Sequence, residues 1–184
     1  NGRYVTFESI ADNLVDGDTK GWNDIFVRDL QTGSTTRVSV SSSGVEGNSD
    51  SSIPSISSDG RYVAFLSNAN NLVIGDTNLA DDIFVYDNLT GITSRVSVSS
   101  SGTQGNDDAG EYDLAISANG RYVAFYSYAS NLVNGDTNDV RDVFVHDLMT
   151  GITTRVSVDS IGNQGNNISY YPSISADGRY VAFN

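Results

Sequence analysis

The apolar residues of this chain follow the short periods of β-strands. Residues 61–67 and 82–87 are rich in β-branched and aromatic side chains on both faces, which is typical of strands buried between two layers. Residues 94–99 alternate polar and apolar side chains, as a half-exposed strand does. Residues 54–57 form another short extended piece before a Ser-Asp-Gly turn. Because no segment shows an apolar period of 3.6 residues, we expect almost no helix.

The same set of strands returns along the chain. The sequence G-R-Y-V-[TA]-F begins at Gly2, Gly60, Gly120 and Gly178, so successive glycines are 58, 60 and 58 residues apart. A period of this length indicates stacked supersecondary units. Four short antiparallel strands per unit predict an all-β chain built of β-propeller blades. A parallel β-helix is the alternative, although its coils are usually much shorter, and a β-sandwich would not explain the period.

The repeats divide the chain into one propeller segment. Residues 1–58 form a first blade that lacks its first strand and run into the start of the second repeat; residues 59–118 and 119–176 are repeats two and three, and residues 177–184 begin a fourth. A propeller needs about four to eight blades, so we expect a partial propeller. Either the parent chain is longer or copies associate to complete the ring. We favour a longer parent, because simple end-to-end closure would duplicate one strand.

Three motifs recur in order: S-x-D-G-R-Y-V-A-F, then D-[IV]-F-V-x-D, then T-G-x-T-x-R-V-S-V. With these motifs the whole chain resembles the TolB-type, WD-repeat-like β-propeller family of bacterial proteins. The resemblance implies a propeller and often a secreted or periplasmic setting, and it implies no single activity. The repeats are longer than is common in that family, with the excess near residues 67–81 and 99–110.

The charge and composition of the chain restrict the classes of partner that it can be expected to bind. The net charge is −13, with 20 Asp against 3 Glu, and Lys20 is the only lysine. Nucleic acid and anionic membranes need Lys/Arg patches, so we expect neither nucleic-acid binding nor membrane insertion. The absence of cysteine excludes disulfides and thiolate zinc sites. Because Asp favours turns and hard-cation sites, the acidity belongs to loops.

One long loop repeats with a pattern of oxygen ligands. The sequence N-L-V-x-G-D-T-[NK]-x-x-x-D occurs once in each repeat, within a connection longer than a hairpin requires. Ca²⁺ is bound by six to eight hard oxygens on such loops, which makes these residues candidate ligands. The alternative is that Gly, Asp, Thr and Asn close ordinary Asx-turns. The candidate Ca²⁺ ligands are Asp18, Asp24, Asp76, Asn78, Asp82, Asp136, Asn138 and Asp142.

Lys20 stands in the first repeat where Asn78 and Asn138 stand in the other two. A cation at that position removes a ligand and repels an ion. We therefore expect the second and third loops to bind Ca²⁺, and the first to bind it weakly or to use the Lys20 ammonium in its place.

Other recurring residues are expected to be structural. Two rows of arginines are candidates for pairing with Asp29, Asp87 and Asp147 or with backbone carbonyls. The aromatic rows are expected in the core, and His146 on an exposed strand surface. The arginine rows are Arg3, Arg61, Arg121 and Arg179, and Arg37, Arg95 and Arg155; the aromatic rows are Tyr4, Tyr62 and Tyr122, and Phe26, Phe84 and Phe144.

Places where one repeat departs from the others are candidates for function. The third unit carries a two-residue insertion in the acidic segment 107–113, which could bind a cation or a basic partner or be a solvated loop. Trp22 is the only tryptophan and is expected to be exposed. With one histidine and no G-x-S-x-G, a Ser-His-Asp triad is not expected, whereas a pair of carboxylates acting on glycosides stays open.

The sequence predicts a non-catalytic, Ca²⁺-stabilised propeller that serves as a binding or structural module of a secreted or cell-surface protein, with the periplasm as another setting. Its expected partners are a protein or glycan at the cell surface, or further copies of itself. The alternatives are an accessory propeller of a larger enzyme and a carbohydrate-binding propeller. The latter needs exposed aromatics, for which the candidates are Trp22, Tyr112, Tyr126, Tyr128, Tyr170 and Tyr171.

Overall fold

The computed structural model describes residues 2–184, with the side chains of Glu111 and Tyr112 excepted. Every regular element in this part of the chain is a β-strand, as predicted, and no helix there could cross a bilayer. The strands are β1 (Tyr4–Ser9), β2 (Asp24–Asp29), β3 (Thr35–Arg37), β4 (Ser51–Ile56), β5 (Tyr62–Ser67), β6 (Asp82–Asp87), β7 (Ile92–Arg95), β8 (Ala109–Ile116), β9 (Tyr122–Ser127), β10 (Asp142–Asp147), β11 (Ile152–Arg155), β12 (Ser173–Ile174) and β13 (Val181–Ala182).

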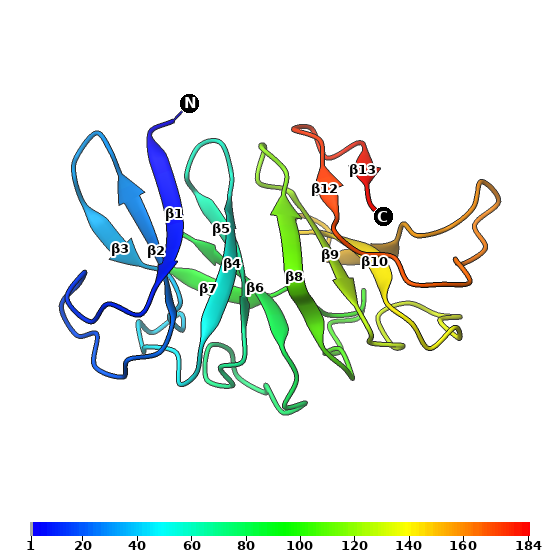
Figure 1. The fold of residues 1–184 in the computed structure, drawn as a ribbon, viewed down its shortest axis with the longest axis horizontal. Helices are drawn as coiled ribbons and strands as arrows, with labels where there is room; N and C mark the ends of the chain where they lie inside the picture. The colour runs from blue at the N-terminus through cyan, green and yellow to red at the C-terminus, as the bar shows by residue number, and fades with distance from the viewer. Residues whose placement is uncertain (1) are drawn as a thin grey trace.

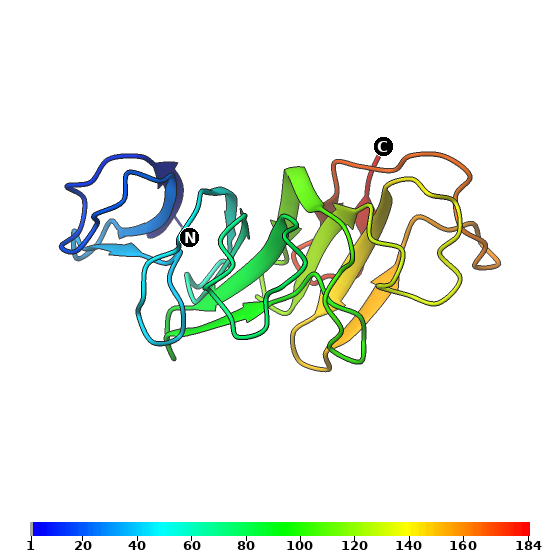
Figure 2. The same cartoon turned by 90° about the horizontal axis from the view of Figure 1, so that it is seen from below.

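The strands form four antiparallel meanders. The order is β1-β2-β3, then β4-β5-β6-β7, then β8-β9-β10-β11, then β12-β13. The sheets stand side by side in a row with their long loops at one edge and their short glycine turns at the other (Figure 1), and the row is seen from below in Figure 2. This is the predicted partial propeller: two complete blades, a first blade of three strands and the beginning of a fourth.

The core lies between blades rather than within one sheet. One apolar cluster joins the first two blades and includes Ile25 and Phe65; a second joins the next pair and includes Ile83 and Phe125. Each blade also stacks one pair of phenylalanines, such as Phe65 on Phe84 with ring centroids 5.9 Å apart. Burial on both faces explains why the middle strands are apolar throughout instead of alternating.

A tyrosine of each blade packs on the glycine turn of the next. A Cβ atom added at Gly120 would overlap the Tyr62 ring, and one added at Gly178 would overlap the ring of Tyr122. These glycines also have positive φ, of 72° and 76°. The D/N-G turn is therefore required both for its backbone conformation and for the room it leaves to the neighbouring blade. The tyrosine row is half-buried at these contacts, while the predicted core phenylalanines Phe26, Phe84 and Phe144 are fully buried.

A serine of each blade fastens the outer strand of the next. The Ser42 hydroxyl accepts a hydrogen bond from Thr93 N at 2.9 Å and donates to Thr93 O at 3.3 Å. Ser100 makes the same two contacts with Thr153. One hydroxyl thus satisfies a donor and an acceptor of a strand edge that would otherwise be open.

Two expectations are corrected here. The predicted strand at residues 94–99 ends at Arg95, because Ser97 turns inward and donates to Asp82. His146 is 6% exposed rather than on the surface, and its Nδ1 lies 2.9 Å from Thr153 Oγ1. The preceding blade covers this site, since Thr153 Oγ1 also donates to Val98 O. Burial lowers the pKa of His146.

Candidate functional site

The long loop of each repeat is held by an arginine. In the second repeat, Arg95 Nη1 lies 2.9 Å from Asp76 Oδ1 and 2.8 Å from Asp82 Oδ2. Its Nη2 donates to Gln104 Oε1 at 2.9 Å. All three charged side chains are at most 9% exposed. The fold therefore brings together the two aspartates that the sequence proposed as ligands, with a guanidinium between them. We call this arrangement the arginine latch.

Local structure explains the position of each latch residue. Asp82 begins β6, directly across the ladder from Ser67, and Arg95 ends β7 opposite Phe84. Ser97 donates to the other oxygen of the Asp82 carboxylate and accepts from Ile83 N at 3.1 Å. The strand ends supply Asp82 and Arg95 from a rigid sheet, and the loop brings Asp76 to them.

The latch recurs in the third blade with the same chemistry. Arg155 Nη1 lies 3.2 Å from both Asp136 and Asp142, and it donates to Gln164 at 2.8 Å. Asn138 donates its amide to Asp142 Oδ2 at 3.1 Å. Asn78 makes the same contact with Asp82.

The first blade departs from this pattern in its charge. Glu46 replaces the glutamine, so Arg37 Nη1 faces three carboxylates, at 3.2 Å from Asp18, 3.3 Å from Asp24 and 2.9 Å from Glu46. These three acids form the only cluster of potential metal-ligating acids, histidines or cysteines found in the described residues. The expectation that the first loop binds Ca²⁺ weakly, or uses the Lys20 ammonium in its place, stays a prediction. The structure adds to that loop a carboxylate that the motif did not include, Glu46, which comes from a different loop of the same blade. The signal was in the sequence, at the position where Gln104 and Gln164 recur.

These contacts bear on the calcium prediction. The carboxylates are gathered as a hard cation requires, but the guanidinium already lies between them and supplies the positive charge. The Asn78 and Asn138 amide groups turn their nitrogen donors toward Asp82 and Asp142. Ca²⁺ needs oxygens from such side chains, so the present arrangement fits an arginine and a bound ion would have to displace it. Calcium binding stays a prediction.

Four aspartates beside the latch arginines have raised pKa values. Burial raises the pKa of Asp18, Asp24, Asp76 and Asp136, and the neighbouring arginine only partly offsets it. Glu46 differs: although burial opposes it, hydrogen bonds from Thr19 and the charge of Arg37 lower its pKa. Closely spaced acids are therefore kept together by a cation that the chain provides.

A second arginine row pairs with aspartates as predicted. Arg61 Nε and Nη2 donate to Asp87 at 3.0 and 2.9 Å, and the Arg61 guanidinium lies over the Tyr62 ring. Arg3 and Arg121 pair in the same way with Asp29 and Asp147. The pKa of each of these three aspartates is lowered, with the arginine hydrogen bond as the main cause.

Acid is expected to destabilise the protein through these three aspartates. Because their folded-state pKa lies below the unfolded value of about 3.9, they stabilise the fold above that pH and lose this contribution as the pH falls further. The raised pKa of Asp18, Asp24, Asp76 and Asp136 acts oppositely: these four aspartates favour the fold as the pH falls toward about 4. Urea unfolding of Asp87→Asn and wild type at several pH values between about 2.5 and 6 measures the difference. A variant with the same acid dependence as wild type below pH 4 would contradict this assignment.

Comparison with known proteins supports the fold. No family model matches the sequence, and no curated protein matches it. TolB from Acinetobacter baumannii superposes with a TM-score of 0.57 at 19% identity, covering 98% of this chain and 34% of TolB. The TolB-like β-propeller fold is therefore shown.

The tricorn protease covers all of this chain at a TM-score of 0.57 and 15% identity, over 14% of its own length. Oligogalacturonate lyase from Vibrio parahaemolyticus has a TM-score of 0.52 and 13% identity, with 99% of this chain and 42% of the lyase covered.

The chain thus spans about a third of the TolB chain that it matches. Similar structures include both TolB and parts of enzymes, so the TolB-like fold leaves activity open.

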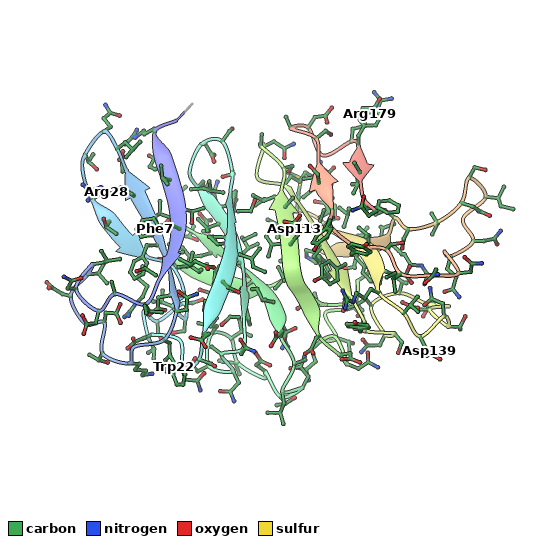
Figure 3. The ribbon with its side chains drawn as sticks, viewed as in Figure 1. Phe7, Trp22, Arg28, Asp113, Asp139 and Arg179 are labelled. Carbon is green, nitrogen blue, oxygen red and sulfur yellow. The ribbon has the colours of Figure 1, made fainter. Side chains whose placement is uncertain are left out.

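The candidate aromatic residues of this TolB-like propeller do not share one environment. Trp22, Tyr128 and Tyr171 are 41%, 37% and 46% exposed, which confirms the expectation for Trp22. Tyr126 is buried, and Tyr170 packs edge-on against Tyr171. The Tyr112 side chain lies outside the described residues. Trp22 lies at the loop edge of the sheets (Figure 3), away from the strand residue Asp113.

The third blade carries a group of residues that the other blades lack. The Arg141 guanidinium lies 4.8 Å from the centre of the Tyr128 ring and 5.6 Å from that of Tyr126, and Arg141 Nε donates to the Tyr128 hydroxyl at 2.5 Å. The acidic segment 107–113 is adjacent: Asp108 O accepts from Tyr128 N. Its insertion widens a bulge in β8 between Ala109 and Leu114, where burial raises the pKa of Asp113. The Glu111 side chain in this segment lies outside the described residues.

Proposed function

We propose that the chain is a non-catalytic binding or structural module of a secreted, periplasmic or cell-surface protein. The observation that carries this proposal is the recurrence of the charged clusters. The arginine latch and the Arg61–Asp87 type of pair occur in each of three blades with equivalent aspartates, although Glu46 replaces the latch glutamine in the first blade. An active site is ordinarily a single constellation, whereas a feature repeated in each blade supports the blade itself.

An activity screen tests this proposal. We expect no turnover of peptide or oligogalacturonate substrates by the purified chain above the buffer rate. Asp113 provides the internal check, because it is a carboxyl with a raised pKa that does not recur in the other blades. Turnover that disappears in Asp113→Asn would overturn the non-catalytic proposal and make this an enzyme domain.

A glycan partner is the second candidate, supported by the group around Tyr128. An exposed aromatic ring beside a guanidinium offers an apolar face and hydrogen-bond donors, which sugars require. Binding to a glycan array that is lost in Tyr128→Ala and kept in Tyr171→Ala would support this role. If a glycan binds equally well to both variants, its binding site lies elsewhere on the molecule.

Calcium is a separate proposal for the latch loops. One ion in each loop would displace the arginine. In the second repeat it would use Asp76 and Asp82, with the Asn78 amide oxygen turned inward, and in the third repeat Asp136 and Asp142, with the Asn138 amide oxygen turned inward. Its support is the paired carboxylates: burial, and then the nearby Asp82 and Asp142 carboxylates, raise the pKa of Asp76 and Asp136.

Thermal unfolding in millimolar Ca²⁺ and then in EGTA tests the calcium proposal. A ligand at 100 times its dissociation constant adds about 2.7 kcal/mol, so the midpoint should rise by several degrees. The rise should be lost in a variant carrying Asp76→Ala and Asp136→Ala. An equal rise in Mg²⁺, or none in Ca²⁺, would leave the arginine as the cation of these loops.

A further inference from the structure

A cleft of about 480 Å³ opens between the first and second blades, at the edge that carries the long loops. The first blade contributes the serine-rich turn at residues 41–45, and the second blade contributes residues 71–74. Leu72, which lines the cleft, is buried, and the Ser41 and Ser43 hydroxyls lie 2.9 Å apart beside it. A blade stands on each side, so the cleft belongs to an interface between two blades.

The same cleft recurs between the second and third blades, with a volume of about 400 Å³. Ser99–Ser101 take the place of Ser41–Ser43, and the buried Leu132 takes the place of Leu72. The repeat therefore forms the cleft wherever two blades meet in this way. Differences between the two clefts then come from individual side chains on an equivalent backbone.

Two exposed lining residues distinguish the first cleft from the second. Val45 is replaced by Thr103, and Ile74 is replaced by Asn134. Val45 is 52% exposed and Ile74 is fully exposed. We call Val45 and Ile74 the rim pair. They come from different blades, and apolar side chains that gather at a groove are typical of binding sites, whereas single exposed ones are ordinary.

The lining of the first cleft restricts its ligand. No charged side chain other than those masked from description, and no aromatic ring, is among the residues that line it. It therefore lacks the flat ring on which sugars pack and the cation that phosphate or carboxylate groups need. Aliphatic groups bordered by serine hydroxyls suit a peptide, because an apolar side chain fills the cleft and the hydroxyls can bond to the adjacent N–H and C=O groups.

The charge around the cleft restricts the partner further. Asp139 lies at the loop edge, whereas Arg28 and Arg179 lie at the opposite edge (Figure 3). Lys20 and Arg141 are the only basic residues in the loops that join second to third strands and successive blades. An acidic edge attracts basic partners and repels acidic ones. The exposed aspartates of these loops include Asp12, Asp16, Asp50, Asp107 and Asp139.

We propose that the cleft between the first and second blades binds an extended segment of a basic partner protein through one aliphatic or aromatic side chain. That side chain inserts between Val45 and Ile74 and contacts Leu72, while lysines or arginines beside it face the acidic loop edge. The second cleft, with Thr103 and Asn134, lacks the apolar rim pair and does not bind this segment. The inference rests on the proposed role as a binding module and names the chemistry of its partner.

Fluorescence anisotropy with labelled synthetic peptides and the full chain tests the proposal. The peptides carry lysine and serine on both sides of one central residue, which is leucine, phenylalanine or glycine. We expect the leucine and phenylalanine peptides to bind about tenfold or more tightly than the glycine peptide, because only they fill the apolar cleft. Glutamates in place of the lysines should weaken binding further. Equal binding of the leucine and glycine peptides, or tighter binding of the glutamate peptide, would overturn the proposal.

Exchanging the rim residues between the two clefts locates the site. Val45→Thr combined with Ile74→Asn gives the first cleft the rim of the second, so the leucine peptide should bind about tenfold or more weakly. Thr103→Val combined with Asn134→Ile is the matched converse, and it should keep the original site and add a second one. All four residues are exposed, so the thermal midpoints should stay unchanged. Undiminished binding to the first variant would overturn the proposed site and leave the non-catalytic role standing, since the activity screen tests that role separately.

Discussion

Replacing Arg95 by methionine is expected to lower the free energy of unfolding by about 3–5 kcal/mol. The guanidinium touches Asp76 and Asp82, whose side chains are 4% and 1% exposed. Without it, two nearby carboxylates are left buried without a counter-charge, and each must be protonated or drawn into water. The methionine keeps most of the aliphatic volume, so the loss measures the charge. Urea unfolding at pH 7 gives the value.

Two companion variants separate the latch from a general arginine effect. Arg61→Met removes a pair in which the arginine side chain is 37% exposed, and it should cost about 1 kcal/mol or less. Arg95→Met combined with Asp76→Asn and Asp82→Asn removes the charges on both sides and should regain part of the loss. A triple variant as unstable as Arg95→Met alone would show that packing, not charge, explains the cost. Ca²⁺ should also protect Arg95→Met more than wild type, because the competing cation is gone.

The fold was predictable because its signals are local and repeated. The Gly2, Gly60, Gly120 and Gly178 turns set the period, and apolar runs such as residues 61–67 identified the buried strands. The ends of the strands were harder to predict from the sequence. Residues 94–99 keep an alternating pattern past Arg95, but Ser97 bonds to Asp82 in the same blade and thereby ends the strand. That contact depends on residues 15 positions apart and leaves no local pattern.

The candidate site was predictable only in part. The loop motif identified Asp76 and Asp82 as neighbours, but it gave no indication that Arg95, from another strand, lies between them. The repeated motif could not distinguish a metal site from an arginine latch, because either would recur in every blade. His146 shows the same limit: its burial comes from the preceding blade, which the pattern of its own strand does not report.

Alanine at Gly120 is expected to cost about 2–5 kcal/mol of unfolding free energy. About 1–3 kcal/mol comes from placing a non-glycine residue at φ of 72°. The rest is steric, because the new Cβ would overlap the Tyr62 ring and lie 3.3 Å from Ser57 Cβ. The backbone on one side and the tyrosine on the other are held by two blades, so neither can move freely. The variant therefore reports how strongly the blades are coupled.

Gly102→Ala isolates the backbone component of that cost. Gly102 has φ of 83°, and a Cβ there meets nothing within 4 Å, so only the conformational penalty should appear. A cycle of Gly120→Ala, Tyr62→Ala and the double variant then gives the coupling energy between ring and turn, measured by urea unfolding. A coupling near zero, with both glycine variants equally destabilised, would mean that the turn needs glycine for its φ angle alone. A favourable coupling in the double variant would establish the tyrosine-on-glycine contact as the element that holds successive blades together.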